Sequence, residues 1–119
     1  MSPAPQTTER LNRVFQALAD PTRRAVLERL GRGPAGMSEL AEPFGMALPS
    51  FAQHLQVLED CGLVSSAKQG RVRTYALAPG ALAPAEHWLE KHRRRWETRL
   101  DQLDAFLLDL NRDKRRSKR

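Results

Sequence analysis

Cysteine is nearly absent from this chain of 119 residues, in which Cys61 is the only one. A lone cysteine excludes an internal disulfide and by itself cannot form a thiolate metal site. Cys61 stands beside Gly62 and has no second thiol with which to form a redox pair. We therefore interpret it as a small, partly buried residue rather than as a redox switch.

Long apolar runs are also missing. No stretch approaches the roughly 20 residues that a helix needs to span a bilayer, and residues 1–6 lack the charged and apolar layout of a signal peptide. The hydrophobic share of 40% and the charged share of 29% are those of a soluble globular protein. We expect a cytoplasmic protein with one domain and a modest core.

Catalytic motifs are equally scarce. The sequence has no Gly-rich phosphate loop, no Gly-x-Ser-x-Gly elbow and no His-Glu-x-x-His pair. His87 and His92 are five residues apart, about 140° around a helix, so they cannot share one metal ion. Glu86 with Glu90, or His87 with Glu90, lie on one helical face, but solvated charges explain such pairs better than a site across a dimer. We expect no catalytic residue, no cofactor and no metal site.

Acidic residues are too few to balance the basic ones. The chain has 20 Lys and Arg against 14 Asp and Glu, which gives a net charge of +6 and a pI near 10.4. Most of the excess lies in residues 112–119, where six basic residues stand against one Asp. This balance suggests nucleic acid as a partner. The basic segment fits a solvated, disordered end as well as one that contacts phosphates without sequence preference.

The sequence does contain a series of helical patterns. We expect residues 1–8 to form a disordered lead. From Glu9 onward apolar residues recur at intervals of three and four, which predicts an amphipathic helix. Asp20 and Pro21 predict the start of a second helix, since Asp caps free N–H groups and Pro at the first helical position loses no hydrogen bond. Gly31 is expected to close this helix.

Two further helices follow closely. Ser38 is a suitable N-cap for a short third helix that ends at Gly45. A fourth helix is predicted to begin at Leu48 and to stop at Gly62. Its core-facing residues share one side of the helix, within about 80°: Leu48, Phe51, Leu55 and Leu58. Two short helices joined by a tight turn, the second amphipathic, are typical of a helix-turn-helix motif.

The pattern then changes to that of β-strands. Residues 63–67 and 72–77 contain β-branched and aromatic residues, and Gln69 and Gly70 predict a turn between them. A two-stranded hairpin directly after a helix-turn-helix is called a wing. The predicted fold class is therefore mainly α with a β-hairpin wing, a winged helix-turn-helix with the element order α-α-α-α-β-β-α.

A long final helix is predicted from Leu82 to about Leu110. Its apolar residues form one stripe at helical spacing: Leu89, Trp96, Leu100, Leu103, Leu107 and Leu110. Such a stripe needs more partner surface than a small domain offers, which favours helix pairing between chains. The predicted organisation is a lead at residues 1–8, a domain at 9–110 and a basic tail at 111–119.

In a helix-turn-helix, the side of the second helix that faces away from the core meets base edges, and flanking polar groups meet phosphates. The candidate DNA-binding residues lie on that side and on the hairpin tip: Pro49, Ser50, Gln53, His54, Gln56, Lys68, Arg71 and Arg73. Gln53 suits a bidentate pair with adenine, and the cations of the tip suit the DNA backbone or minor groove. Each residue alone also fits an ordinary exposed position, so the prediction depends on the whole set.

Five motifs occur in the chain in a specific order. They are Ala19-Asp20-Pro21-Thr22-Arg23-Arg24, Ser38-Glu39-Leu40-Ala41, Leu48-Pro49-Ser50-Phe51-Ala52-Gln53-His54-Leu55-Gln56-Val57-Leu58-Glu59, Cys61-Gly62-Leu63-Val64 and Gly70-Arg71-Val72-Arg73-Thr74-Tyr75. Together they resemble the ArsR/SmtB family of bacterial repressors, over about residues 8–108. The resemblance implies a homodimer, joined by its first and last helices, that binds an imperfect palindrome in a promoter. The residues expected at that dimer interface are Leu11, Phe15, Leu89, Trp96, Leu100, Leu103 and Leu107.

The fourth helix, which is the second of the helix-turn-helix and its recognition helix, departs from the family pattern. Members commonly have Ser at the cap of this helix and again in a Ser-(Arg/Lys)-His-Leu stretch, whereas this chain has Ala47, Ala52 and Gln53. Two hydroxyls and a positive charge are therefore missing. This departure leaves a second interpretation open, in which the chain is a winged-helix protein–protein dimerisation module with weak or lost DNA binding.

The inducing signal is a second departure. Many members sense metals through cysteines of the third helix, and residues 38–45 contain none. The last helix, with Trp88 and Trp96, resembles the metal-free branch of the family. These tryptophans fit core or interface packing better than a ligand pocket. The sequence leaves open a small-molecule or protein effector as the inducing signal.

Overall fold

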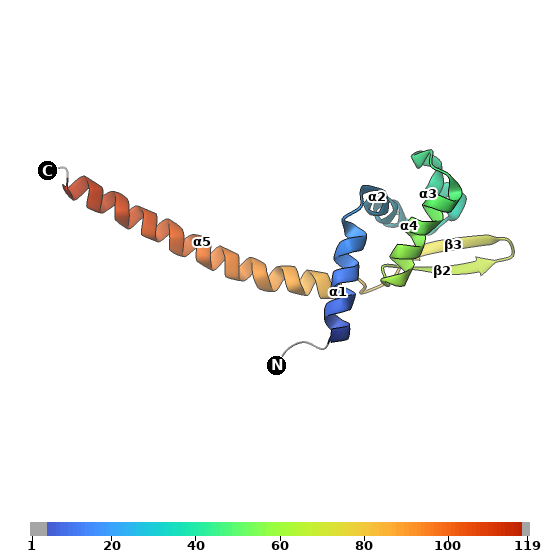
Figure 1. The fold of residues 1–119 in the computed structure, drawn as a ribbon, viewed down its shortest axis with the longest axis horizontal. Helices are drawn as coiled ribbons and strands as arrows, with labels where there is room; N and C mark the ends of the chain where they lie inside the picture. Colours follow the sequence, from blue (N-terminus) through green and yellow to red (C-terminus); the bar gives the residue numbers. More distant parts are fainter. Residues whose placement is uncertain (1–4, 118–119) are drawn as a thin grey trace. The chain divides into compact units, whose positions relative to one another are not determined.

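The computed structural model describes residues 5–117, and residues 1–4 of the predicted lead lie outside them (Figure 1). Its elements are α1 (Pro5–Leu18), α2 (Pro21–Leu30), β1 (Ala35–Gly36), α3 (Met37–Ala41), the 3-10 helix η1 (Glu42–Phe44), α4 (Leu48–Asp60), β2 (Val64–Gln69), β3 (Val72–Leu77) and α5 (Ala83–Ser117). The chain forms two compact units, Met1–Ala85 and Glu86–Arg119, which are described separately. The mainly helical fold with a hairpin wing is confirmed.

The start of α2 follows the sequence prediction. Oδ2 of Asp20 accepts a hydrogen bond of 3.0 Å from the backbone N–H of Arg23, and Pro21 occupies the first helical position. This bond occupies one of the free N–H groups at the helix start. The helix ends at Leu30, with Gly31 as its C-cap, also as predicted. The first helix differs, because α1 begins at Pro5 and takes in residues that we expected in the disordered lead.

A short strand, β1, was not predicted. Ala35 pairs with Tyr75 and Gly36 with Thr74, so the sheet is antiparallel in the order β1-β3-β2. A strand of two residues is too short to show an alternating pattern, and only its pairing with β3 defines it. This strand joins the hairpin to the start of α3.

The helix-turn-helix consists of α3, η1 and α4. The N-cap of α3 is Gly36 rather than Ser38, and Ser38 lies inside the helix, so that prediction is wrong. The helix therefore starts two residues earlier than the sequence suggests, directly after Gly36, which pairs with Thr74 of β3. Gly45 ends η1 with a φ of 59°, a conformation that favours glycine. The predicted start of α4 at Leu48 is confirmed.

The inner side of α4 carries much of the core. Phe51, Leu55 and Leu58 are fully buried, as predicted, whereas Leu48 is 53% exposed and was wrongly assigned to the core. Leu48 is the first residue of the helix, and side chains there point back past the helix end, away from the packed turns. The core residues are Val14, Ala17, Val26, Leu30, Ala35, Leu40, Ala41, Phe51, Leu55, Leu58, Leu63, Val64, Tyr75 and Ala85.

The wing consists of β2 and β3, which pair antiparallel from Val64 with Leu77 to Gln69 with Val72 (Figure 1). Because Gln69 still pairs, the turn lies at Gly70 and Arg71, one residue later than predicted. Gly70 has a φ of 64°, and a two-residue hairpin loop often needs glycine at its first position. The turn therefore places Arg71 at the tip of the wing.

The helix α5 has 35 residues, and the second unit begins within it, at Glu86. It was predicted to end near Leu110, but it continues to Ser117, so residues 111–117 of the predicted basic tail are helical. The side chains of Leu89, Trp96 and Leu103 are each about half exposed in the single chain. Within residues 5–117, no helix is long and apolar enough to cross a membrane.

Candidate nucleic-acid interface

The outer side of α4 is polar and lacks acidic side chains over residues 48–58. Four of the residues that we placed on this side are exposed, namely Pro49, Ser50, Gln53 and Gln56, and their neighbour Val57 is exposed as well. Nε2 of Gln56 donates a hydrogen bond of 2.8 Å to Oδ1 of Asp60, so this amide already has a partner. Ser50 and Gln53 have no side-chain hydrogen bond within the described part of the chain. Their polar groups are the ones free to meet a ligand.

The N-terminus of α4 also lacks a side-chain cap. Ala47 occupies the cap position and forms no side-chain hydrogen bond, and Pro49 lies within the first turn. A Ser, Thr, Asp or Asn cap would accept from one of the free N–H groups of the first turn. Those N–H groups thus stay available to an acceptor such as a phosphate oxygen.

His54 is held differently from its neighbours on α4. Its side chain is 23% exposed, and Nδ1 lies 3.3 Å from NH1 of Arg23 and 3.6 Å from Oδ2 of Asp20. We predicted His54 as one of the DNA-binding residues on the outer side of this helix. The structure places it between α4 and the junction of α1 and α2, because both partners come from that junction.

Asp20 is the acidic member of this contact. The hydrogen bond from the backbone N–H of Arg23 holds its pKa below the usual value; burial opposes this shift, and the charge of Arg23 adds to it. Asp20 is therefore a carboxylate near neutral pH. The junction keeps one negative charge beside the imidazole and the guanidinium.

The wing brings its three predicted cations close to α3. Lys68, Arg71 and Arg73 are exposed and line a hollow of about 510 Å³ together with Met37, Ser38 and Glu39. NH1 of Arg73 donates a hydrogen bond of 2.8 Å to Oγ of Ser66, which fixes one of the three. The sequence did not indicate Ser38 as part of this surface, because the strand β1 that places it there has no sequence signal.

The predicted dimer residues fall into two groups. Leu11 and Phe15 of α1 are half-buried and pack on the core of their own chain. The residues of α5 form an exposed apolar set: Leu89, Trp96, Leu100, Leu103 and Leu107. Trp88, His92 and Trp96 form a ladder of rings along α5, with centroid distances of 4.3 Å and 6.1 Å between neighbours.

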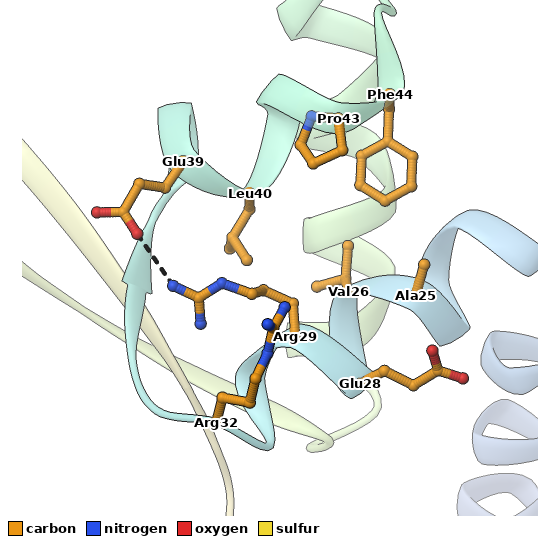
Figure 2. Close-up of a pocket in the computed structure, with 9 residues that line it drawn as sticks. All are labelled: Ala25, Val26, Glu28, Arg29, Arg32, Glu39, Leu40, Pro43 and Phe44. Carbon is orange, nitrogen blue, oxygen red and sulfur yellow. Dashed lines mark hydrogen bonds and ion pairs between the residues drawn. The ribbon is translucent and has the colours of Figure 1, made fainter.

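A second hollow, of about 540 Å³, lies between α2 and the α3–η1 segment (Figure 2). Val26, Leu40 and Phe44 form its apolar part. NH2 of Arg29 forms an ion pair of 3.1 Å with Oε2 of Glu39 at its rim. This pair ties α2 to α3, and the charged side chains of Glu28 and Arg32 line the hollow as well.

The next feature is the placement of the metal-ligating and thiol side chains in the described residues. Within residues 5–117 no three His, Cys, Asp or Glu side chains are grouped to hold a metal ion. Cys61 is half-buried, and Sγ lies 3.3 Å from the carbonyl oxygen of Leu58. Burial raises the pKa of this thiol, which keeps it protonated and poorly reactive near neutral pH.

Comparison with known proteins agrees with this geometry. A helix-turn-helix domain family model matches residues 18–67. The transcriptional repressor SdpR of Bacillus subtilis is 33% identical over 79 residues, which are 66% of this chain and 88% of the relative. The crystal structure of an ArsR family transcriptional regulator, RHA00566, is 56% identical, with a TM-score of 0.73, over 82% of this chain and 97% of that chain. This chain belongs to the ArsR family of transcriptional regulators.

Two further relatives agree with the assignment. The HTH-type transcriptional regulator Rv2034 of Mycobacterium tuberculosis is 46% identical over 72 residues, 60% of this chain and 67% of the relative. A solution structure of a Mycobacterium bovis protein, described as a homodimeric winged helix-turn-helix DNA-binding domain, is 27% identical with a TM-score of 0.59, over 73% of this chain and 82% of that chain. The resemblance of the sequence motifs to the ArsR family is thus confirmed.

Proposed function

We propose that this ArsR-family chain is a homodimeric, sequence-specific DNA-binding regulator that represses transcription from an imperfect palindrome in a promoter. The observation that carries the proposal is the outer side of α4. There Ser50 and Gln53 are exposed without partners, while the opposite side of the same helix is packed into the core. A helix held in this way presents its outer side as one rigid surface to a major groove.

The contacts proposed for α4 are few. The amide of Gln53 can donate to and accept from adenine at once, which is worth about 1–3 kcal/mol of base discrimination. Ser50 and the uncapped N–H groups of the first turn suit phosphate oxygens. Gln56 contributes less, because it bonds to Asp60 in the free protein.

The wing supplies the sequence-independent part of the affinity. Lys68, Arg71 and Arg73 line one hollow beside Ser38. A sugar–phosphate backbone that enters it meets three cations, a hydroxyl and the carboxylate of Glu39, which is paired with Arg29. Charge neutralisation of this kind releases counterions and makes binding strongly salt-dependent. We infer a larger share for the wing here than for the recognition helix, because Ala47, Ala52 and Gln53 replace two hydroxyls and a cation of the family pattern.

Dimerisation is inferred from α5 and α1. A single chain that exposes Trp96, Leu100 and Leu103 on one helix leaves apolar surface of the kind that protein interfaces cover. The Mycobacterium bovis relative is homodimeric. Two copies would present two α4 helices to successive major grooves, about 34 Å apart. This function places the protein in the cytoplasm, with the DNA.

We also infer that induction does not depend on a metal held by α3, as in the metal-free branch of the family. Residues 37–41 contain no cysteine or histidine, and the ring of His92 lies between those of two tryptophans. Zinc analysis of dialysed protein checks this inference. One tightly held ion per subunit would contradict it.

Selection from a random duplex library tests the proposal directly. The full-length protein is expected to enrich a palindromic site with half-sites one helical turn apart. Fluorescence anisotropy then compares that site with a scrambled duplex of equal length at moderate salt, where non-specific binding is weak. A preference of at least a hundredfold is expected. Equal affinity for both duplexes would reject DNA regulation and favour a protein–protein dimerisation module.

A further inference from the structure

The side chain of Arg23, at the start of α2, bridges the end of α1 and the recognition helix. Nε donates a hydrogen bond of 2.9 Å to the carbonyl of Ala17, and NH2 donates one of 2.9 Å to the carbonyl of Gln16. These carbonyls belong to the last turn of α1, and that of Gln16 also accepts a bond of 3.2 Å from the backbone N–H of Ala19. The remaining nitrogen, NH1, lies 3.3 Å from Nδ1 of His54 on α4.

The chemistry of this contact fixes the state of the ring. A guanidinium group carries only N–H donors, so Nδ1 of His54 must act as the acceptor. In a neutral imidazole one nitrogen accepts and the other carries the proton. The proton of the neutral ring therefore resides on Nε2. Oδ2 of Asp20, 3.6 Å from Nδ1, is too far for a hydrogen bond and already accepts from the N–H of Arg23.

The second ring nitrogen is open to solvent. Nε2 of His54 has no hydrogen-bond partner among the described residues, and none of their buried side-chain nitrogens or oxygens lacks a partner. Nε2 must therefore be accessible. It lies on the ring edge away from Arg23, on the same helix as Ser50 and one position after Gln53. A protonated nitrogen there is a hydrogen-bond donor of the kind that phosphate oxygens accept.

We propose that Arg23 is a positioning residue for DNA recognition: it holds His54 as the Nε2–H tautomer, with that donor directed to a backbone phosphate, and ties the recognition helix to the end of α1. The proposal rests on the proposed function. His54 then acts as a phosphate ligand that is set before DNA arrives. The same guanidinium also makes the placement of α4 depend on α1, one of the helices inferred to join the dimer.

Arg24 offers a matched control. Its NH1 donates a hydrogen bond of 2.7 Å to the carbonyl of Leu18, so Arg24 also binds the end of α1, but it does not contact His54. Loss of a cation beside α1 is thus common to Arg23→Met and Arg24→Met. Only the first change removes the donor to the imidazole.

The first experiment reads the tautomer in the free protein. Long-range proton–nitrogen NMR spectra of the neutral ring are expected to show His54 protonated on Nε2 in the wild type and in Arg24→Met. In Arg23→Met a mixture of both tautomers is expected. A wild-type ring protonated on Nδ1, or an Arg23→Met spectrum equal to that of the wild type, would overturn the proposal.

The second experiment is a double-mutant cycle on the duplex that the wild type selects. Arg23→Met and His54→Ala are each expected to weaken binding about tenfold, and the double variant no more than about twentyfold, because both changes remove one contact. Arg24→Met and His54→Ala are expected to be additive. If the effects of Arg23→Met and His54→Ala were additive instead, the proposed coupling of Arg23 to His54 would be overturned, while DNA binding itself would stand.

His54→Gln leaves Arg23 unchanged and tests the phosphate contact even if Arg23→Met fails to fold. The amide of His54→Gln offers an acceptor to Arg23 and a donor to a phosphate, so it is expected to recover most of the affinity that His54→Ala loses. Affinity equal to that of His54→Ala would count against the phosphate contact. Should the wild type prefer no duplex at all, the proposed function fails and the phosphate contact with it, while the NMR experiment still decides whether Arg23 sets the tautomer.

Discussion

The hydroxyl of Ser66 on β2 donates a hydrogen bond of 2.6 Å to Oε1 of Glu59 in the last turn of the recognition helix. The same oxygen accepts a bond of 2.8 Å from NH1 of Arg73 on β3. One hydroxyl thus joins α4 to both strands of the wing. The wing and the recognition helix must address the same duplex, so their relative angle matters for binding.

Removal of this hydroxyl is expected to loosen the wing. Ser66→Ala should lower the free energy of unfolding by about 1 kcal/mol, since one side-chain hydrogen bond is lost and Glu59 is left partly unpaired. Ser65→Ala is the control, because Ser65 is an exposed neighbour with no side-chain hydrogen bond in the described chain. Urea denaturation of both variants measures the difference. Equal stabilities would show that the bond adds nothing.

Asp20 predicts the pH dependence of stability. Its pKa is lowered in the folded chain, chiefly by the backbone N–H of Arg23, so its stabilising effect is present above the unfolded value of 3.8 and is lost as the pH falls below it. Asp20→Asn keeps a capping oxygen without the charge and should flatten this acid limb of the curve. Asp20→Ala should lose about 1 kcal/mol at neutral pH. Thermal unfolding between pH 2 and 7 follows both effects; an Asn variant with the wild-type acid limb would contradict the assignment.

The sequence predicted those parts of the fold that depend on neighbouring residues. The cap at Asp20, the start of α4 at Leu48 and the burial of Phe51 follow from local hydrogen bonding and helical spacing. The strand β1 could not be predicted, because its two residues form a strand only through β3. Leu48 was wrongly assigned to the core because helical spacing identifies which side of a helix is apolar. It does not show at which residue along that side the packing ends.

The candidate DNA interface could likewise be predicted from the sequence only where local patterns define it. Ser50 and Gln53 could be identified as exposed from the helical pattern alone. The contact of His54 with Arg23 joins residues 31 positions apart, and no local pattern connects them. The hollow beside the wing combines Ser38 with Arg71 through a strand pairing that the sequence hides. Contacts between distant segments decide which polar residues are free and which are held.

The two parts of the proposed DNA surface should respond differently to mutation. Gln53→Ala is expected to relax preference at one base pair in each half-site, at a cost of about 1–3 kcal/mol for the best sequence. Arg71→Ala should weaken all sequences alike and reduce the slope of affinity against salt by about one ion per subunit. Gln56→Ala is the control for Gln53, because its amide already bonds to Asp60. Titrations of base-substituted duplexes at several salt concentrations separate these effects.

The stripe on α5 predicts which leucines hold the dimer together. Leu103 and Leu108 are 50% and 61% exposed in the single chain, but they lie five residues apart, about 140° around the helix. Leu103 is on the stripe with Trp96 and Leu100, and Leu108 is not. Leu103→Lys should bury an unpaired charge in the interface and raise the dimer dissociation constant at least a hundredfold. Leu108→Lys makes the same chemical change outside the stripe and should leave the constant within about threefold. Sedimentation equilibrium measures both, and equal effects of the two changes would show that the stripe is not the dimer interface.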